Sequence, residues 1–179
     1  MVDETVTGTG LDELRAAYDA HARPLLRLAV ALTADPALAE DLVHDAFVRL
    51  HRAARPPAPE AEGAYLRRIV TNLSHDHHRH GAVVRRLAPA PGDPAPSAEL
   101  DALGGDRARA VAAAVAALPA RQRDCVALHY FGGLTDAAVA AELGISAGSV
   151  KTHLHRGMDR LRTALGPEDD LEVRLVHGT

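Results

Sequence analysis

The sequence predicts an all-α protein with two small helical domains joined by a flexible, acidic linker that is rich in proline and glycine. The 179 residues include no tryptophan and few other aromatics, while 47% are hydrophobic, which favours helices packed through aliphatic side chains. Apolar residues recur at steps of three and four along residues 11–88 and 107–166. Residues 89–106 between them contain proline, glycine and acids but no basic residue, a composition that cannot build a core.

The ends of the chain and its single cysteine indicate the class of protein. Residues 1–10 are polar, do not resemble a secretory signal and are expected to be disordered, and residues 167–179 form a short acidic tail. No apolar run approaches the roughly 20 residues that span a bilayer. Cys125 alone makes neither an internal disulfide nor a Cys-x-x-Cys zinc module. We therefore expect a cytoplasmic, monomeric protein.

Three helices are predicted in the N-terminal domain. The first runs from about Leu11 to Leu32, with a kink or break expected at Pro24. The second begins with Asp35 as its cap and Pro36 at its first helical position, a strong start signal. The third covers about Ala64 to His80. The proline-rich segment 52–63 before it is predicted to be a loop that shapes a recognition pocket.

The C-terminal domain carries a helix-turn-helix pattern. Thr135 is predicted to cap a helix over Asp136–Leu143, Gly144 to end it, and Ser146 to cap a second helix. The second helix has an apolar stripe at Val150, Leu154, Met158, Leu161 and Leu165. Polar and basic residues line the opposite face, as in helices that enter the major groove of DNA. An ordinary amphipathic surface helix is the alternative.

Charge is divided unevenly along the chain, whose net charge is −4. Residues 107–166 hold eight basic and four acidic residues, a balance of +4, and residues 65–88 hold five arginines and one aspartate, also +4. Two basic segments on an acidic chain indicate two nucleic-acid surfaces, with the acids left for another partner. The alternative is that these arginines are solvated helix faces.

Four histidines, His75, His77, His78 and His80, suggest a metal site at first sight. However, the only acid beside them is Asp76, and no cysteine completes a tetrahedral set. We expect no metal, no other cofactor and no catalytic site. A metal-dependent hydrolase is the remote alternative, because no nucleophile or phosphate loop accompanies the cluster.

Three segments follow one another along the chain: DLVHDAFVRLHR, then AYLRRIVTNLSHDHHRH, then LPARQRDCVALHYFGGLTDAAVAAELGISAGSVKTHLHRGMDRLRTAL. In this order the chain resembles the sigma-70 family of transcription initiation factors, specifically its small extracytoplasmic-function (ECF) group, which keeps only regions two and four. The resemblance covers about residues 11–88 and 107–166. It implies a sigma factor that binds core RNA polymerase, recognises the −10 and −35 promoter elements and helps to melt DNA.

The resemblance implies roles for individual residues. The segment that binds core polymerase corresponds to Asp41, Asp45, Phe47, Arg49 and Leu50. The segment for the −10 element corresponds to Arg67, Arg68, Asn72, His75, Asp76 and Arg79. The helix for the −35 element would present Ser149, Lys151, Thr152, His153, Arg156 and Arg160, with Arg121 and Arg123 on phosphates. Alternatively, Phe47 and Leu50 belong mostly to the core, and Asp76 pairs with Arg79 or Arg68.

The partners that the resemblance implies are the clamp and flap of core polymerase, promoter DNA as duplex and as melted single strand, and an anti-sigma protein. The linker would thread through the polymerase channel, or would serve as a plain spacer. Association with the nucleoid is expected in the cytoplasm. The competing function is a conventional helix-turn-helix regulator that binds duplex DNA without core polymerase.

Overall fold

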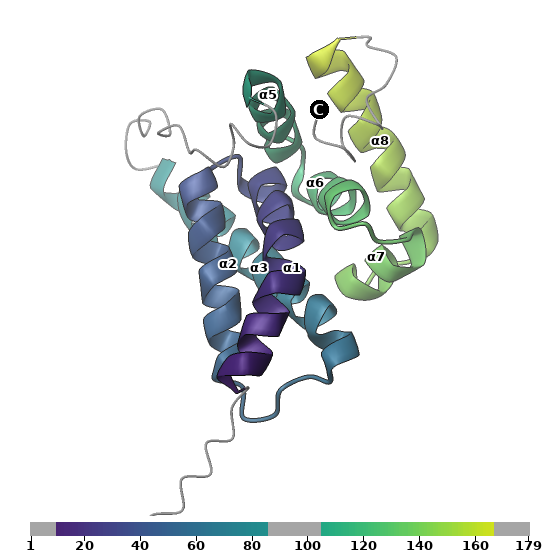
Figure 1. The fold of residues 1–179 in the computed structure, drawn as a ribbon. Helices are drawn as coiled ribbons and strands as arrows, with labels where there is room; N and C mark the ends of the chain where they lie inside the picture. The colour runs from purple at the N-terminus through teal and green to yellow at the C-terminus, as the bar shows by residue number, and fades with distance from the viewer. Residues whose placement is uncertain (1–9, 86–104, 167–179) are drawn as a thin grey trace, which may run out of the picture.

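The computed structural model describes the backbone of residues 10–85 and 105–166, and the side chains of 10–79 and 107–166. The expectations for residues 1–9, for most of the linker, for the 167–179 tail and for the His80 side chain lie outside the described residues. Every regular element in the described ranges is helical, which confirms the all-α prediction (Figure 1). In chain order the elements are α1 Leu11–Thr33, α2 Pro36–His51, α3 Pro59–Arg85, α5 Gly105–Ala116, α6 Ala120–Val126, the π-helical turn η1 Ala127–Phe131, α7 Asp136–Leu143 and α8 Ala147–Leu165.

The N-terminal bundle consists of α1, α2 and α3. The start of α2 is as predicted, because the Asp35 side chain accepts a hydrogen bond from the Leu38 backbone N–H at 3.1 Å and Pro36 follows it. Helix α1 continues through Pro24, so the break expected there does not occur. Residues 28–32, which follow Pro24, are all buried, and this packing stabilises the second half of α1 as part of the same helix.

Helix α3 is longer than predicted at both ends. It begins at Pro59 instead of Ala64, because proline suits the first helical position and the glutamates at 60 and 62 suit the positive end of a helix dipole. The prediction of a loop over 52–63 is therefore wrong for its second half. The connection between α2 and α3 shrinks to residues 52–58.

The helix-turn-helix is confirmed in detail. The Thr135 hydroxyl accepts from the Ala138 N–H at 3.3 Å, and the Ser146 hydroxyl accepts from the Ser149 N–H at 3.1 Å. Between the two helices Gly144 adopts the left-handed conformation, with φ of 64°, that ends a helix without a steric cost. The predicted apolar stripe of α8 faces inward: Val150, Met158 and Leu161 are buried, and Leu154 and Leu165 pack against the core.

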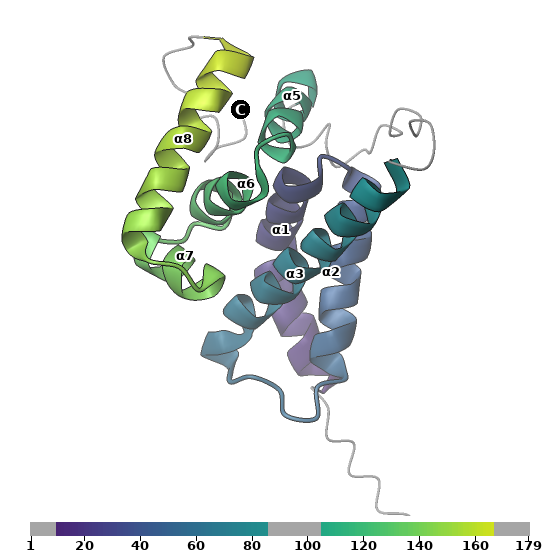
Figure 2. The ribbon, with the colours of Figure 1, turned by 180° about the vertical axis from the view of Figure 1, so that it is seen from behind.

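The two bundles pack against each other. Helix α1 contacts α2 and α3 on one side and α5 and η1 on the other, so it lies between the two halves of the molecule (Figures 1 and 2). The buried apolar residues of both bundles form one continuous cluster. The sequence predicts the two helical units, but it does not predict this docking of one on the other.

Helices α6 and α8 approach closely at Gly157, and this contact is testable. A Cβ atom added there would lie 2.9 Å from Cγ2 of the fully buried Val126. We expect Gly157→Ala to lower the free energy of unfolding by about 1–3 kcal/mol through overpacking, measured by urea denaturation. The control is Gly148→Ala in the same helix. A Cβ atom there would lie 3.9 Å from the Ser146 hydroxyl oxygen, so we expect no loss of stability. Equal stability of both variants would contradict close packing at Gly157.

Candidate nucleic-acid interface

Helix α3 presents an exposed polar stripe. Arg68, Asn72, Asp76 and Arg79 follow one another at steps of four, four and three, so they share one side of the helix, and all four are exposed. Asp76 forms an ion pair with Arg79, as one alternative at the sequence level predicted. The stripe therefore offers two cationic groups and one amide to a ligand in solution.

Two other residues predicted for the −10 element, Arg67 and His75, lie on the side of α3 that faces the C-terminal bundle. Arg67 Nε is 3.9 Å from Glu142 Oε2 on α7, and His75 Nε2 is 2.9 Å from Asp124 Oδ1 on α6. Figure 2 shows α7 beside α3 in this arrangement. The structure thus divides the predicted −10 set into an exposed stripe and a pair held by carboxylates of the other bundle.

Those two carboxylates were not singled out from the sequence. Asp124 is 1% exposed, and the Glu142 side chain is 10% exposed. No periodicity or motif marks a residue whose partner lies more than 40 positions away in another bundle. Burial raises the pKa of the Glu142 carboxyl, and the nearby guanidinium groups of Arg67 and Arg68 offset part of that effect.

The two arginines predicted to hold phosphates differ in environment. Arg121 is exposed, whereas Arg123 is 6% exposed and donates from Nη1 to the Ala116 carbonyl oxygen at 3.3 Å. Burial lowers the pKa of Arg123, and the adjacent Asp124 opposes this effect. Arg123 is thus part of the packing of the C-terminal bundle and does not present its guanidinium to DNA in this arrangement.

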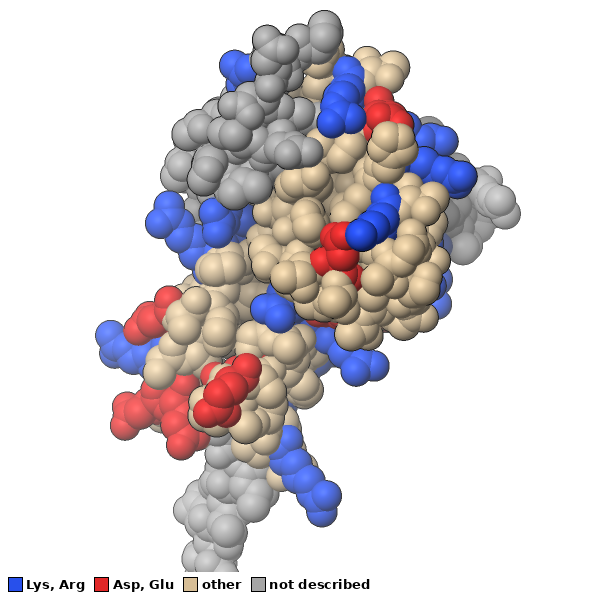
Figure 3. Space-filling model, turned by 90° about the vertical axis from the view of Figure 1, so that its right-hand side faces the viewer, with Lys and Arg blue, Asp and Glu red and all other residues tan. Residues whose placement is uncertain are grey.

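The outer face of α8 matches the predicted recognition surface. Lys151, Thr152, Arg156 and Arg160 are exposed, and Ser149 and His153 are half-buried. On the side of the molecule shown in Figure 3, basic side chains are spread from top to bottom, with a few acidic ones among them and a further acidic group toward the lower left. The helix begins directly after the short turn at Gly144–Ser146, as the second helix of a helix-turn-helix does.

The residues predicted to bind core polymerase fall into an exposed group and a buried group. Asp41 and Asp45 are exposed, one helical turn apart on α2, and Arg49 is exposed one turn further along. Phe47 and Leu50 are buried, and the Phe47 ring packs on Tyr18 with centroids 5.0 Å apart. The alternative that these two residues belong to the core is thus the one the structure supports.

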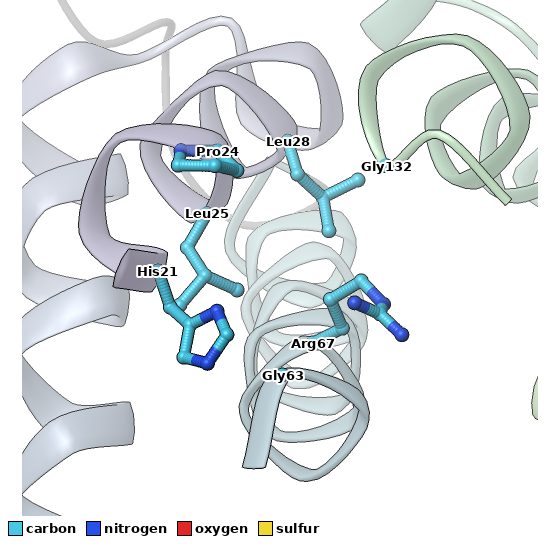
Figure 4. A pocket seen from close by; sticks show the side chains of 7 residues that line it. All are labelled: His21, Pro24, Leu25, Leu28, Gly63, Arg67 and Gly132. Atoms are coloured by element: carbon cyan, nitrogen blue, oxygen red, sulfur yellow. The ribbon is translucent and has the colours of Figure 1, made fainter. Parts of the chain in front are cut away.

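Nothing among the described side chains forms a metal or cofactor centre. No group of three or more His, Cys, Asp or Glu side chains is placed to hold an ion in that part of the chain. His78 Nε2 is instead 2.8 Å from the Leu32 carbonyl oxygen. A cavity of about 30 Å³ lies between the bundles, lined by α1, by Arg67 and by Gly132 (Figure 4), and it holds little more than a water molecule.

Comparisons with known proteins agree with this geometry. The family described as Sigma-70 region 2 matches residues 17–83, and the family described as Sigma-70, region 4 matches residues 108–161. The ECF RNA polymerase sigma factor SigL of Mycobacterium tuberculosis is 32% identical over 162 residues, which cover 85% of this chain and 88% of that protein. The chain belongs to the ECF group of the sigma-70 family.

Two further matches differ in how much they cover and in how similar the sequences are. A probable RNA polymerase sigma factor of Xanthomonas campestris, RfaY, is 33% identical over 77% of the chain, which spans only 36% of the length of RfaY. The solved sigma factor RpoE of Bartonella quintana, determined with the anti-sigma factor NepR, superposes with a TM-score of 0.60. That match covers 86% of this chain and 94% of the other at 23% identity, so it supports the fold. No described helix is both long and apolar enough to cross a bilayer.

The buried carboxyl of Glu142 makes stability depend on pH. A raised pKa means that the folded state holds this proton at pH values where the unfolded state has released it. The stabilising contribution is therefore full below the ordinary glutamate pKa and is lost as pH rises through the raised value. We expect Glu142→Gln to gain free energy of unfolding relative to the unmodified protein as the pH rises above the ordinary glutamate pKa, measured by urea denaturation. Asp19→Asn, at an exposed position of α1, is the control with no such trend; a pH-independent difference for Glu142→Gln would contradict the prediction.

Proposed function

We propose that this sigma factor binds core RNA polymerase through α2 and directs it to promoters that α3 and α8 recognise together. The observation that carries the proposal is the pair of exposed polar helix faces on two separate bundles, one on each segment that matches a sigma-70 region. Such a factor contributes binding and positioning, and the polymerase performs the chemistry. The site of action would be the cytoplasm, at the nucleoid.

The exposed stripe of α3 suits the melted −10 element. Melting replaces base stacking with contacts to protein, and an unstacked base exposes the edge that an amide such as Asn72 can pair with. Arg68 and Arg79 suit the flanking phosphates. A flipped base costs a few kcal/mol, which several such contacts can offset. Residues 52–58, the actual connection before α3, would line part of the base pocket.

The face of α8 suits the −35 element as duplex. Lys151 and Arg156 are exposed on the first turns of the helix, where side chains of a recognition helix reach base edges. Arg160 and Arg121 suit the phosphate backbone. The hydroxyls of Ser149 and Thr152 are each within hydrogen-bonding distance of an atom in α8 or its cap, at 2.9 and 3.0 Å, so we assign them a lesser role.

The acidic pair on α2, Asp41 and Asp45, suits a basic surface of core polymerase, with Arg49 beside it. The flap of polymerase and an anti-sigma protein are proposed as further partners. The complex of RpoE with NepR supports the second of these as a type of interaction.

Run-off transcription tests the proposal. Core polymerase from the source organism would transcribe fragmented genomic DNA with and without the protein, and the RNA 5′ ends would be sequenced. New start sites that share two upstream elements are expected. No new starts together with no binding to core would overturn the proposal and leave a duplex-binding regulator.

Two arginine substitutions test the promoter contacts on one promoter found in this way. Arg68→Ala and Arg156→Ala are each expected to lower initiation about tenfold, since a good contact to a base or phosphate contributes about 1–3 kcal/mol. The charge-matched controls are Arg15→Ala on α1 and Arg162→Ala on α8, both exposed and outside the proposed faces. If Arg15→Ala and Arg162→Ala lowered initiation as much as Arg68→Ala and Arg156→Ala, the loss of any positive charge would explain the effect, and the proposed contacts would be wrong.

Core binding is tested separately from DNA. We expect Asp41→Lys with Asp45→Lys to weaken binding to core polymerase at least tenfold in a fluorescence-anisotropy titration, because like charges would then meet. Arg15→Glu, a charge reversal elsewhere on the surface, is the control. Unchanged affinity of the double variant would place the core-binding surface elsewhere.

A further inference from the structure

The outward side of α8 carries a histidine, His155, between the two basic residues proposed to reach base edges. Helix α8 lies at the outer edge of the molecule (Figures 1 and 2). Lys151, His155 and Asp159 follow one another at steps of four, so they share one side of the helix, and all three are exposed. Arg156, next in the chain to His155, is exposed as well. The His155 side chain is 78% exposed, so a ligand on this face meets it directly.

His153, the histidine that the resemblance assigns to the −35 element, lies in a different environment. It is half-buried and stands one helical turn before Gly157, where α8 approaches Val126 of α6. Its Nδ1 atom is buried without a hydrogen-bond partner among the described residues. One polar edge of the His153 ring is therefore turned toward protein, and His155 is the histidine of α8 whose ring is open to DNA.

An acidic residue one turn further along α8 holds the His155 ring. His155 Nε2 lies 3.4 Å from Asp159 Oδ2, while Asp159 Oδ1 accepts from Arg162 Nη1 at 3.3 Å. Asp159 is the only acidic residue in α8. A carboxylate on a DNA-binding face opposes the attraction to phosphates, and exposed pairs of this kind add little to stability. Neither backbone binding nor helix stability accounts for Asp159, whereas orientation of the His155 ring does.

The contact with Asp159 selects the ring atom that meets a ligand. A carboxylate only accepts hydrogen bonds, so a neutral imidazole beside it carries its proton on Nε2, and Nδ1 presents a lone pair. In the major groove the donors are the exocyclic amino groups at adenine N6 and cytosine N4, while N7 of purines, guanine O6 and thymine O4 are acceptors. An acceptor at a fixed place in the groove therefore favours the base pair that puts its amino group there.

We propose that His155, oriented by Asp159, reads one base pair of the −35 element by accepting a hydrogen bond from its amino group, adenine N6 or cytosine N4. The inference deepens the proposed role of α8 in −35 recognition and rests on it. Asp159 acts through His155 and is a positioning residue. The proposed contacts of Lys151 and Arg156, on either side of His155, keep this part of α8 in the groove.

Selection from a randomised duplex tests which histidine reads a base. Holoenzyme, formed from core polymerase and the full chain, would bind a promoter found by run-off transcription whose −35 element is randomised, and the bound DNA would be sequenced. We expect His155→Ala to lose about tenfold in discrimination at one base pair, as for one good base contact, and to keep the other preferences. His153→Ala tests the rival assignment and is expected to keep the preference that His155→Ala loses.

Base analogues at that pair test the chemistry. Purine in place of adenine, or 2-pyrimidinone in place of cytosine, removes only the amino group. We expect this change to weaken binding of the unmodified holoenzyme about tenfold more than binding of the His155→Ala holoenzyme, which is the coupling that a direct contact produces. A 7-deazapurine at the same pair removes an acceptor and is the control, with no such coupling. Coupling of His155 to N7 instead would mean that the ring donates, and would overturn the amino-group contact.

Asp159→Asn separates orientation from charge. It removes a negative charge from a face that meets phosphates, so overall affinity for the duplex is expected to rise. Discrimination at the His155 base pair is expected to fall in the same variant, because an amide both donates and accepts and so holds the ring in either tautomer. A rise in affinity with this discrimination intact would overturn the positioning role of Asp159.

The selection also separates this inference from the proposed function. If the unmodified holoenzyme enriches no −35 sequence, the role of α8 fails, and the inference that rests on it fails as well. If it enriches one and His155→Ala leaves every preference unchanged, α8 keeps its role and the inference alone is wrong. Because position 155 is exposed, His155→Ala is expected to fold as the unmodified protein does, which circular dichroism checks.

Discussion

The burial of α1 on two sides is the constraint on which the rest of the structure depends. Leu28 and Leu32 are fully buried, and α1 contacts α2 and α3 as well as α5 and η1. Complete burial of a leucine side chain contributes about 1.5–3 kcal/mol, so a few such residues supply most of what holds the bundles together. Helix α1 therefore belongs to the core of the N-terminal bundle and also forms the surface on which the C-terminal bundle packs. The position of α6 and α7 over α3 follows from that docking.

In the interface between α3 and the C-terminal bundle, charged groups contribute differently from buried apolar side chains. Burial raises the pKa of Glu142, and the attraction of Arg67 and Arg68 offsets only part of that effect, as is common for buried ion pairs that contribute little net stability. It selects the orientation instead, because a carboxylate buried at this site without a cation would be far more costly. Such a pair favours arrangements in which the buried carboxyl meets a cation, while apolar contacts supply most of the free energy. This division explains why a single charge reversal is a sharper probe of docking than removal of an apolar side chain, which would damage the core of one bundle as well.

Local signals in the sequence predict most of the helices. They fail where contacts between distant segments determine which side chains are buried or paired. Asp35, Thr135 and Ser146 mark helix starts through their own side chains, so α2, α7 and α8 begin where expected. The start of α3 was misplaced because proline 59 fits either a loop or a first helical turn. The π-helical turn η1 has no sequence signature. The exposed members of the candidate site follow from family resemblance, but the burial of Arg123 and the engagement of Arg67 and His75 depend on packing between bundles.

The consequence for function comes from which groups the interface uses. Asp124 and Glu142 present to α3 the same chemistry as a phosphate backbone, namely anionic oxygen at the distance of an ion pair. Under the proposed function, the −10 residues of α3 that remain exposed in this arrangement are Arg68, Asn72, Asp76 and Arg79, while Arg67 and His75 contact the C-terminal bundle.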